Sequence, residues 1–205
     1  MARSLKKLIA AVFCLVLLFE LSSCAVNTKS AEQTGFSMGS LVGIKLYGKD
    51  ASALENANLL AEVVKTDERI SKNYEGSDIY RVNSSGEHGE TVSVETYDEL
   101  RTVCDVYSDS HGKAAALSGA LTELWGFDTD EFRLPSEDGI LSAKEKCGDD
   151  KLIFDDGKKV YIPDGAKLNL GSAGKGIALD EAVKRIDEIN SQGGKITGAV
   201  ISVGG

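Results

Sequence analysis

The sequence has 205 residues and is acidic, with 32 Asp and Glu against 23 Lys and Arg and a formal net charge of -9 at pH 7. An acidic surface repels nucleic-acid phosphates and anionic lipid, so we exclude nucleic acid as a partner and charge as a means of membrane attachment. The length is sufficient for a single domain with its own core.

The amino-terminal residues predict an export signal that ends at a lipid-bearing cysteine. A basic stretch at residues 3–7 precedes an apolar run at residues 8–19 and the small residues LSSC, which is the order of a secretory signal. About 12 apolar residues are too few for a helix to cross a hydrocarbon core of ~30 Å. Because LSSC resembles a lipobox, we expect residues 1–23 to be a lipoprotein signal peptide and Cys24 to be lipidated. The alternative is an ordinary signal with a chance cysteine.

Lipidation of Cys24 predicts a location at the extracytoplasmic face of the cell membrane. Residues 1–23 carry three positive charges and one negative charge, so their removal changes the net charge from -9 to -11. The lipid, and not charge, would then provide the attachment. We interpret residues 24–35 as a polar tether and residues 36–205 as the domain.

The alternation and spacing of apolar residues predict an α+β fold, with a mixed sheet and packed helices. In the first half of the domain we expect a strand at 36–47, a helix at 51–70, a loop at 71–78, a short helix or turn at 79–83, a strand at 91–95, and a helix capped by Thr96. In the second half, Trp125 and Phe127 are expected to anchor a core, and Ser136 to begin a helix. A hairpin at 151–162, a glycine loop at 171–176, a long helix and a buried strand at 197–203 follow.

Two features of the second half leave alternatives open. Cys104 and Cys147 are the cysteines that remain for the domain; they could form a disulfide, or could be buried apolar side chains. The sequence stops two glycines after an expected core strand, and we therefore expect the chain to be part of a longer protein.

The glycine loop GSAGKG at residues 171–176 is the most suggestive local motif for ligand binding. Glycines allow the backbone to approach a ligand closely, and amides at a helix start can donate to a phosphate, with Lys175 adding a charge. The spacing fits neither a P-loop nor a dinucleotide fingerprint. A plain helix entry with tight packing is the competing interpretation.

Four stretches in order resemble the ApbE-type flavin transferases, the FAD:protein FMN transferase family. They are FSMGSLVGIKLYG, SDIYRVN, LSGALTELWGF and KLNLGSAGKGIALDEA. The resemblance covers about residues 35–205, and it implies an ApbE-like, T-fold-related domain that is incomplete at its carboxyl end. It also implies transfer of the FMN half of FAD onto a threonine hydroxyl of an exported or membrane redox protein, with Mg²⁺ required and AMP released.

The resemblance assigns roles by position. Ser172 would give a ligand to magnesium, and the positions expected to contact FAD are Met38, Tyr74, Ala114, Ala115, Asn169 and Lys175. The family has an aromatic or aliphatic residue followed by Asp where this chain has Ala114 and Ala115, and Asp where it has Asn169. Further metal ligands of the family lie beyond the matched part, so the activity of this chain is in question.

Two other functions compete with the transferase. One is a non-catalytic exported lipoprotein that retains the fold, which the alanines and Asn169 favour. The other is a covalent flavin carrier, because SGALT at residues 118–122 approaches a short flavin acceptor sequence whose threonine would be Thr122.

Overall fold

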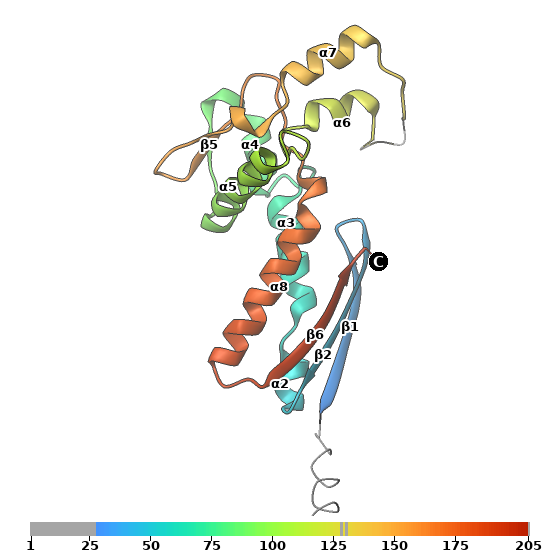
Figure 1. Cartoon of the computed structure of the whole chain (residues 1–205), viewed down its shortest axis with the longest axis vertical. Coiled ribbons are helices and arrows are strands. Elements are labelled where there is room, and N and C mark those ends of the chain that lie inside the picture. Colours follow the sequence, from blue (N-terminus) through green and yellow to red (C-terminus); the bar gives the residue numbers. More distant parts are fainter. Residues whose placement is uncertain (1–27, 128, 130, 205) are drawn as a thin grey trace, which may run out of the picture.

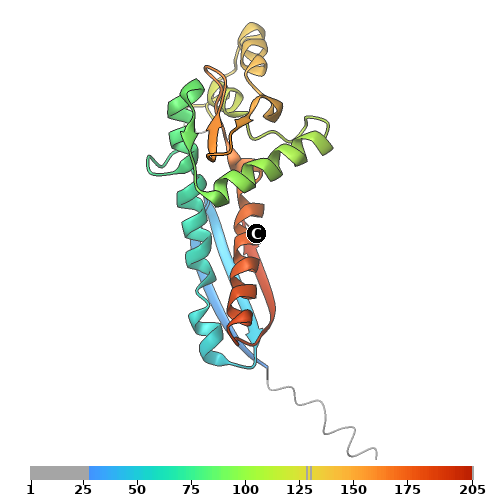
Figure 2. The same ribbon diagram turned by 90° about the vertical axis from the view of Figure 1, so that its left-hand side faces the viewer.

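The structure is a computed structural model, and it describes residues 28–127, 129 and 131–204. The molecule is elongated, with a long sheet and its helices at one end and a second part, built from the other helices and a short-stranded sheet, at the other (Figures 1 and 2). The predicted signal peptide and Cys24 lie outside the described residues. Within the described residues, no helix is both long and apolar enough to span a membrane.

The long sheet has three antiparallel strands in the order β1-β2-β6. Strands β1 (Lys29–Ser37) and β2 (Ser40–Gly48) form a hairpin, and β6 (Ile196–Val203) pairs with the other side of β2. Alternate residues of β2, namely Val42, Ile44 and Leu46, are buried, as the alternation in the sequence predicts.

The structure corrects the sequence-based interpretation of this region at three points. Residues 29–35 are not a tether, because β1 pairs with β2 along its whole length, and the expected single strand at 36–47 is a hairpin. The polar side chains of β1 alternate outward, which gives the stretch the composition of a linker. The last strand is not a buried core strand: β6 is at the sheet edge and Val200 is 61% exposed.

Helices cover one face of this sheet. They are α2 (Ala51–Asn56), α3 (Leu59–Ile70) and α8 (Gly174–Ser191), and α3 and α8 lie side by side in both views (Figures 1 and 2). The predicted helix at 51–70 is interrupted at Asn58, whose φ of 44° is left-handed. The core between sheet and helices includes Val42, Leu46, Leu59 and Val63.

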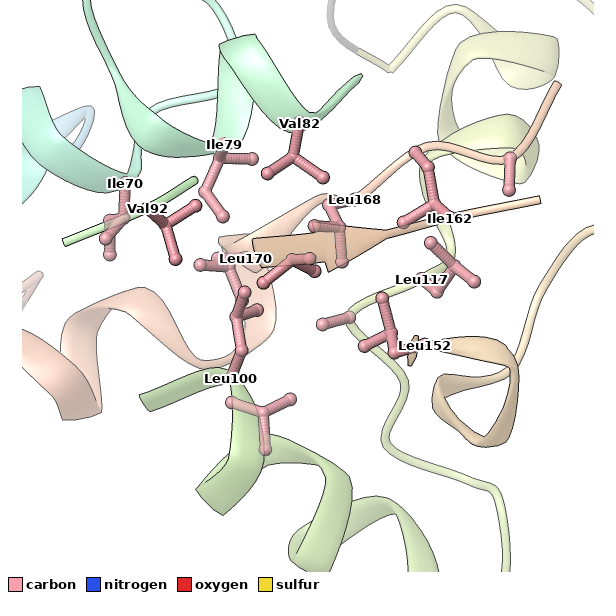
Figure 3. Close-up of a cluster of buried hydrophobic side chains, with 14 of the residues drawn as sticks. Ile70, Ile79, Val82, Val92, Leu100, Leu117, Leu152, Ile162, Leu168 and Leu170 are labelled. Atoms are coloured by element: carbon pink, nitrogen blue, oxygen red, sulfur yellow. The ribbon is translucent and has the colours of Figure 1, made fainter. Parts of the chain in front are cut away.

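The second part contains the remaining elements. Its helices are α4 (Asp78–Ser85), α5 (Val94–Asp109), α6 (Gly119–Trp125) and α7 (Glu137–Glu145), with 3₁₀ turns η2 (Gly86–His88), η3 (Asp149–Lys151) and η4 (Leu170–Ser172). A second antiparallel sheet has the order β3-β5-β4, from β3 (Glu90–Thr91), β4 (Ile153–Phe154) and β5 (Lys159–Tyr161). Figure 3 shows its core, where side chains such as Ile79, Val82, Leu100, Leu117 and Leu168 converge.

Most predicted elements of this part are confirmed, with local differences. The helix starting near residue 94 is capped by Ser93, whose hydroxyl accepts from the Thr96 amide, so Thr96 is not the cap. The strand predicted at 91–95 is observed only as the two-residue strand β3, Glu90–Thr91. Phe127 is 60% exposed and stacks on the half-buried Trp125 with ring centroids 5.9 Å apart, so the predicted aromatic anchor lies outside the two core clusters.

An ion pair joins α3 to α5. Arg69 donates to both carboxylate oxygens of Glu99, at 2.5 and 2.6 Å, and also to the Thr96 hydroxyl at 2.9 Å. The two charged side chains are only 15% and 11% exposed. This contact fixes the second part against the helix layer of the sheet. The α+β fold class is confirmed, and both sheets are antiparallel.

Candidate functional site

Two cavities meet at the loop that leads into α8. The first, which we call the loop cavity, has a volume of about 600 Å³ and is bordered by the turn at residues 112–115, by α6, by the end of α7 and by residues 169–172. The second, the hairpin cavity, has a volume of about 410 Å³ and lies between the β1–β2 turn, the end of α3 and residues 169–175. Asn169 and Gly171 line both, so the cavities are neighbours across this loop. Both volumes are in the range of ligand pockets, ~300–1,000 Å³.

The hairpin cavity is shaped by the turn between β1 and β2. Met38 and Gly39 both have positive φ, 52° and 67°, as a two-residue primed turn requires. The carboxylate of Asp67 on α3 accepts the Met38 amide at 2.6 Å and the Ser37 hydroxyl at 2.9 Å. These contacts hold a non-glycine residue in a conformation that is otherwise unfavourable. Met38 is thereby presented to the cavity while packing on both cores.

The loop before α8 supplies the opposite wall of the hairpin cavity. Lys175 lies in the first turn of α8 and lines this cavity together with Gly174. The amide of Gly171 donates to the Asn169 side chain at 2.9 Å, and that of Ala173 donates to the Leu170 carbonyl at 3.0 Å. These two backbone donors of the glycine loop are therefore engaged within the protein. With these two amides engaged, this part of the loop is a capped start of a helix and not the predicted phosphate-binding loop.

Asn169 links the two cavities through its side chain. Its oxygen accepts the Gly171 amide, and its NH₂ group donates to the Thr122 hydroxyl at 3.1 Å. The Thr122 hydroxyl in turn donates to the Gly119 carbonyl at 3.0 Å. The Thr122 hydroxyl has donated its proton to Gly119, so toward residue 169 it can act only as an acceptor. The NH₂ group of an amide is a donor and therefore suits this position.

Asp149 organises the wall formed by residues 114–118. Its side chain is 2% exposed, and its two oxygens accept the amides of Ala116 at 3.0 Å and Leu117 at 2.6 Å. Burial raises the pKa of this carboxyl above its usual value of 3.8, and the two backbone hydrogen bonds oppose that effect. Sequence reasoning missed Asp149 and Asp67, since each acts on backbone about 30 residues away.

Cys104 and Cys147, the two cysteines among the described residues, are free thiols, so the disulfide alternative is not realised in the structure. Cys147 lines the loop cavity. Cys104 is half-buried against the core, and burial raises its pKa to about 11. Burial also raises the pKa of Cys147. Cys104 also lies near Asp149 and Asp105, which raise its pKa further, so it lacks the electropositive surroundings of a reactive cysteine.

A magnesium site is not present among the residues that the structure describes. They contain no group of three His, Cys, Asp or Glu side chains that could hold a metal. Of the oxygens near Ser172, that of Asn169 accepts the Gly171 amide and that of Thr122 accepts the Asn169 NH₂ group. Mg²⁺ needs about six oxygen ligands, usually including a carboxylate, and no carboxylate lines the loop cavity. The described residues therefore do not fit this ion.

Six of the seven positions assigned by resemblance border these two cavities. Ala114, Ala115 and Ser172 line the loop cavity, Met38 and Lys175 line the hairpin cavity, and Asn169 lines both. The exception is Tyr74, which is 54% exposed and packs over Gly76. Their contact with a flavin nucleotide stays a prediction.

Comparison with known proteins identifies relatives of this fold. A family model described as the ApbE family matches residues 38–205. A search of curated proteins found no match. Three solved structures are similar: the ApbE protein from Thermotoga maritima (24% identity, TM-score 0.73), the flavin transferase ApbE from Vibrio cholerae (22%, 0.70), and the flavinyl transferase ApbE from Pseudomonas stutzeri in its apo form (22%, 0.73).

These matches cover most of this chain but only part of the relatives. They span 84%, 87% and 86% of this chain, and 57%, 58% and 56% of the Thermotoga, Vibrio and Pseudomonas chains respectively. At these identities the likeness establishes the fold. The chain spans less than two thirds of the length of each of these structures.

Proposed function

The chain belongs to the ApbE family, and we propose on this basis that it is a flavin transferase, which moves the FMN half of FAD onto a threonine hydroxyl of an exported or membrane redox protein and releases AMP. The observation that supports this most directly is the pair of cavities that meet at Asn169 and Gly171. Two neighbouring cavities suit a ligand with two ends, such as a dinucleotide.

The proposed step is a phosphoryl-type transfer. The threonine oxygen bonds to the FMN-side phosphorus while the bond from that phosphorus to the bridging oxygen breaks. AMP leaves with the bridging oxygen, and the hydroxyl proton ends on AMP or in solvent. Catalysis of such a step depends on positioning and on compensating the phosphate charge. Met38 and Asn169 would position the nucleotide, and Lys175 would contribute a positive charge at the hairpin cavity.

The resemblance also implies a requirement for Mg²⁺, with Ser172 as one ligand. Because the described residues do not complete such a site, we assign no step of this proposal to a metal ion. Adding and removing Mg²⁺ in the transfer assay tests the requirement separately.

We further propose that the protein is exported and anchored by a lipid on Cys24. The supporting observation is the order of basic, apolar and small residues before Cys24. Substitution Cys24→Ser should abolish incorporation of labelled palmitate and release the protein from the membrane fraction. A membrane-bound, unlabelled wild-type protein would contradict the proposed lipid anchor.

The transferase activity is tested with the full chain purified from membranes in detergent. The protein is incubated with FAD and a candidate acceptor, with and without Mg²⁺. We expect AMP in solution and an acceptor mass increased by one FMN, located on a threonine. Riboflavin as donor is the control, since it has no pyrophosphate to cleave. Absence of both products with acceptors that a full-length ApbE transferase modifies would refute the proposed activity.

Such a negative result would favour the non-catalytic lipoprotein. Its supporting observation is that Ala114 and Ala115 give the loop cavity no polar side chain where the family has an acid. The flavin carrier receives no support from the geometry, because the Thr122 hydroxyl is hydrogen-bonded to both Gly119 and Asn169. A flavin mass on Thr122 of the purified protein would nevertheless identify a carrier.

A further inference from the structure

The charge lining the loop cavity is opposite to that of the chain. The sequence has a net charge of -9, yet the charged side chains that line this cavity are Lys113 and Lys144, with no carboxylate. A third cavity, of about 530 Å³ between α5 and α8, shows the contrast, because its charged lining residues are five acids, Glu95, Asp98, Glu99, Asp180 and Glu181, and one base, Lys184. The loop cavity is therefore a local positive site on an acidic protein.

Both lysines are available to a ligand. Lys113 lies in the turn after α5, where His111 and Gly112 have positive φ, and Lys144 lies in the last turn of α7. No carboxylate among the described residues is in salt-bridge distance of either ammonium group. The two acids that follow Gly148 of the cavity wall have other partners: Asp149 accepts two backbone amides, and Asp150 is hydrogen-bonded to Tyr107.

The neutral groups of the cavity suit an anion as well. Ser118 and Ser172 bring hydroxyl groups to its wall, and Ala114 and Ala115 add small apolar side chains. Two ammonium groups attract phosphate oxygens and repel a divalent cation at the same place. The two lysines therefore add to the misfit of magnesium that follows from the lack of a carboxylate in the cavity lining.

We propose that the loop cavity binds the phosphate groups of its ligand directly through Lys113 and Lys144, without a divalent metal ion. The ligand class is a pyrophosphate or phosphate ester, and the inference deepens the proposed function by stating how the nucleotide charge is compensated in this chain. The lysines line the same cavity as positions 115 and 169, where the resemblance leads one to expect acids and this chain has none.

The experiment measures binding by calorimetry to the full chain in detergent, in EDTA and then with Mg²⁺. The probes are FAD, ADP, inorganic pyrophosphate and riboflavin, of which only riboflavin lacks phosphate. We expect FAD, ADP and pyrophosphate to bind in EDTA. Riboflavin should bind at least ~10-fold more weakly than FAD, because ~10-fold is the loss expected for one charge-assisted contact. Binding of FAD and ADP but not pyrophosphate would assign the site to nucleotides; this also supports the proposal.

Variants then identify the side chains. Lys113→Met and Lys144→Met should each weaken binding of ADP by about 10-fold, whereas Lys113→Arg and Lys144→Arg should retain it. The matched control is Lys65→Met, which removes one charge from a side chain that is 76% exposed on α3 and should leave binding unchanged. All of these are surface substitutions, and unchanged thermal unfolding verifies that each variant is folded.

Two results would overturn the proposal: nucleotide binding that is undetectable in EDTA and appears with Mg²⁺, or Met variants at both positions that bind as tightly as the unchanged protein. The outcome is separable from that of the transfer assay. Lysine-dependent binding without AMP release refutes the transferase and keeps this inference. AMP release that requires Mg²⁺, together with binding that does not depend on the lysines, supports the transferase and refutes this inference.

Discussion

Substitution of Asp149 provides the strictest test of how the site is built. In Asp149→Ala the amides of Ala116 and Leu117 lose their acceptors. Both residues are fully buried, so water cannot replace the carboxylate without a change in structure. An unsatisfied buried donor costs ~1–3 kcal/mol. We therefore expect Asp149→Ala to lower the free energy of unfolding by about 2–6 kcal/mol, which is a large share of the ~5–15 kcal/mol that stabilises a domain.

Asp149→Asn separates the hydrogen bonds from the charge. The amide side chain keeps one acceptor but turns an NH₂ group toward the second backbone donor, so we expect an intermediate loss. Because burial raises the pKa of Asp149 in the folded protein, the folded state retains its proton to a higher pH than the unfolded state. The stability that this group contributes is therefore full below the usual pKa of 3.8 and is lost as pH rises through the raised value. The Asn variant should lack this part of the pH dependence.

The assay is urea unfolding of the full chain, followed by tryptophan fluorescence and circular dichroism at several pH values. The matched control is Asp156→Ala, because Asp156 is exposed in the β4–β5 turn; it should change the free energy of unfolding by less than ~0.5 kcal/mol. If Asp149→Ala unfolds within that same margin of the unchanged protein, the reasoning about the buried amides is refuted.

Three further substitutions or treatments test other contacts. Arg69→Met leaves the nearly buried Glu99 carboxylate without its two hydrogen bonds, so the free energy of unfolding should fall by about 3 kcal/mol; a change under ~0.5 kcal/mol in urea unfolding would contradict this. Gly119→Ala places a methyl group 2.6 Å from Cβ and 2.7 Å from the carbonyl oxygen of Lys167, so a loss of about 1–3 kcal/mol is expected, and an unchanged midpoint would show that α6 can move freely. A pKa of about 11 against an ordinary 9.0 predicts that iodoacetamide at pH 8 alkylates Cys104 about 100-fold more slowly than an ordinary cysteine; peptide mass spectrometry gives the rate, and fast labelling would mean that Cys104 is not buried.

Local patterns in the sequence predicted the elements that depend on neighbouring residues. The helix at 94–109, the short helix near 79–83, the hairpin at 151–162 and the last helix and strand are confirmed. Each has a signal within a few residues, such as helical spacing of apolar side chains or a turn sequence between two β-like runs.

The parts that failed depend on partners far along the chain. The Met38–Gly39 turn lacks the Asn-Gly or Asp-Gly sequence of a primed turn, and the Asp67 carboxylate that supports it lies on another element. Strand β1 is polar because alternate side chains face solvent, which made it indistinguishable from a linker. Trp125 and Phe127 satisfied the composition of a core and stack on each other instead. The two acids that shape the cavities gave no local signal at all.

Strand β1 acts as a rigid spacer if Cys24 is lipidated as proposed. Five residue steps separate Cys24 from Lys29, a reach of at most ~18 Å at ~3.5 Å per residue, and the nine residues of β1 then extend for about 30 Å at ~3.3 Å per residue. The hairpin turn at the far end of this strand borders the hairpin cavity. That cavity would thus stand within a limited height above the bilayer, and a membrane-bound acceptor would be selected partly by the height at which it presents its threonine.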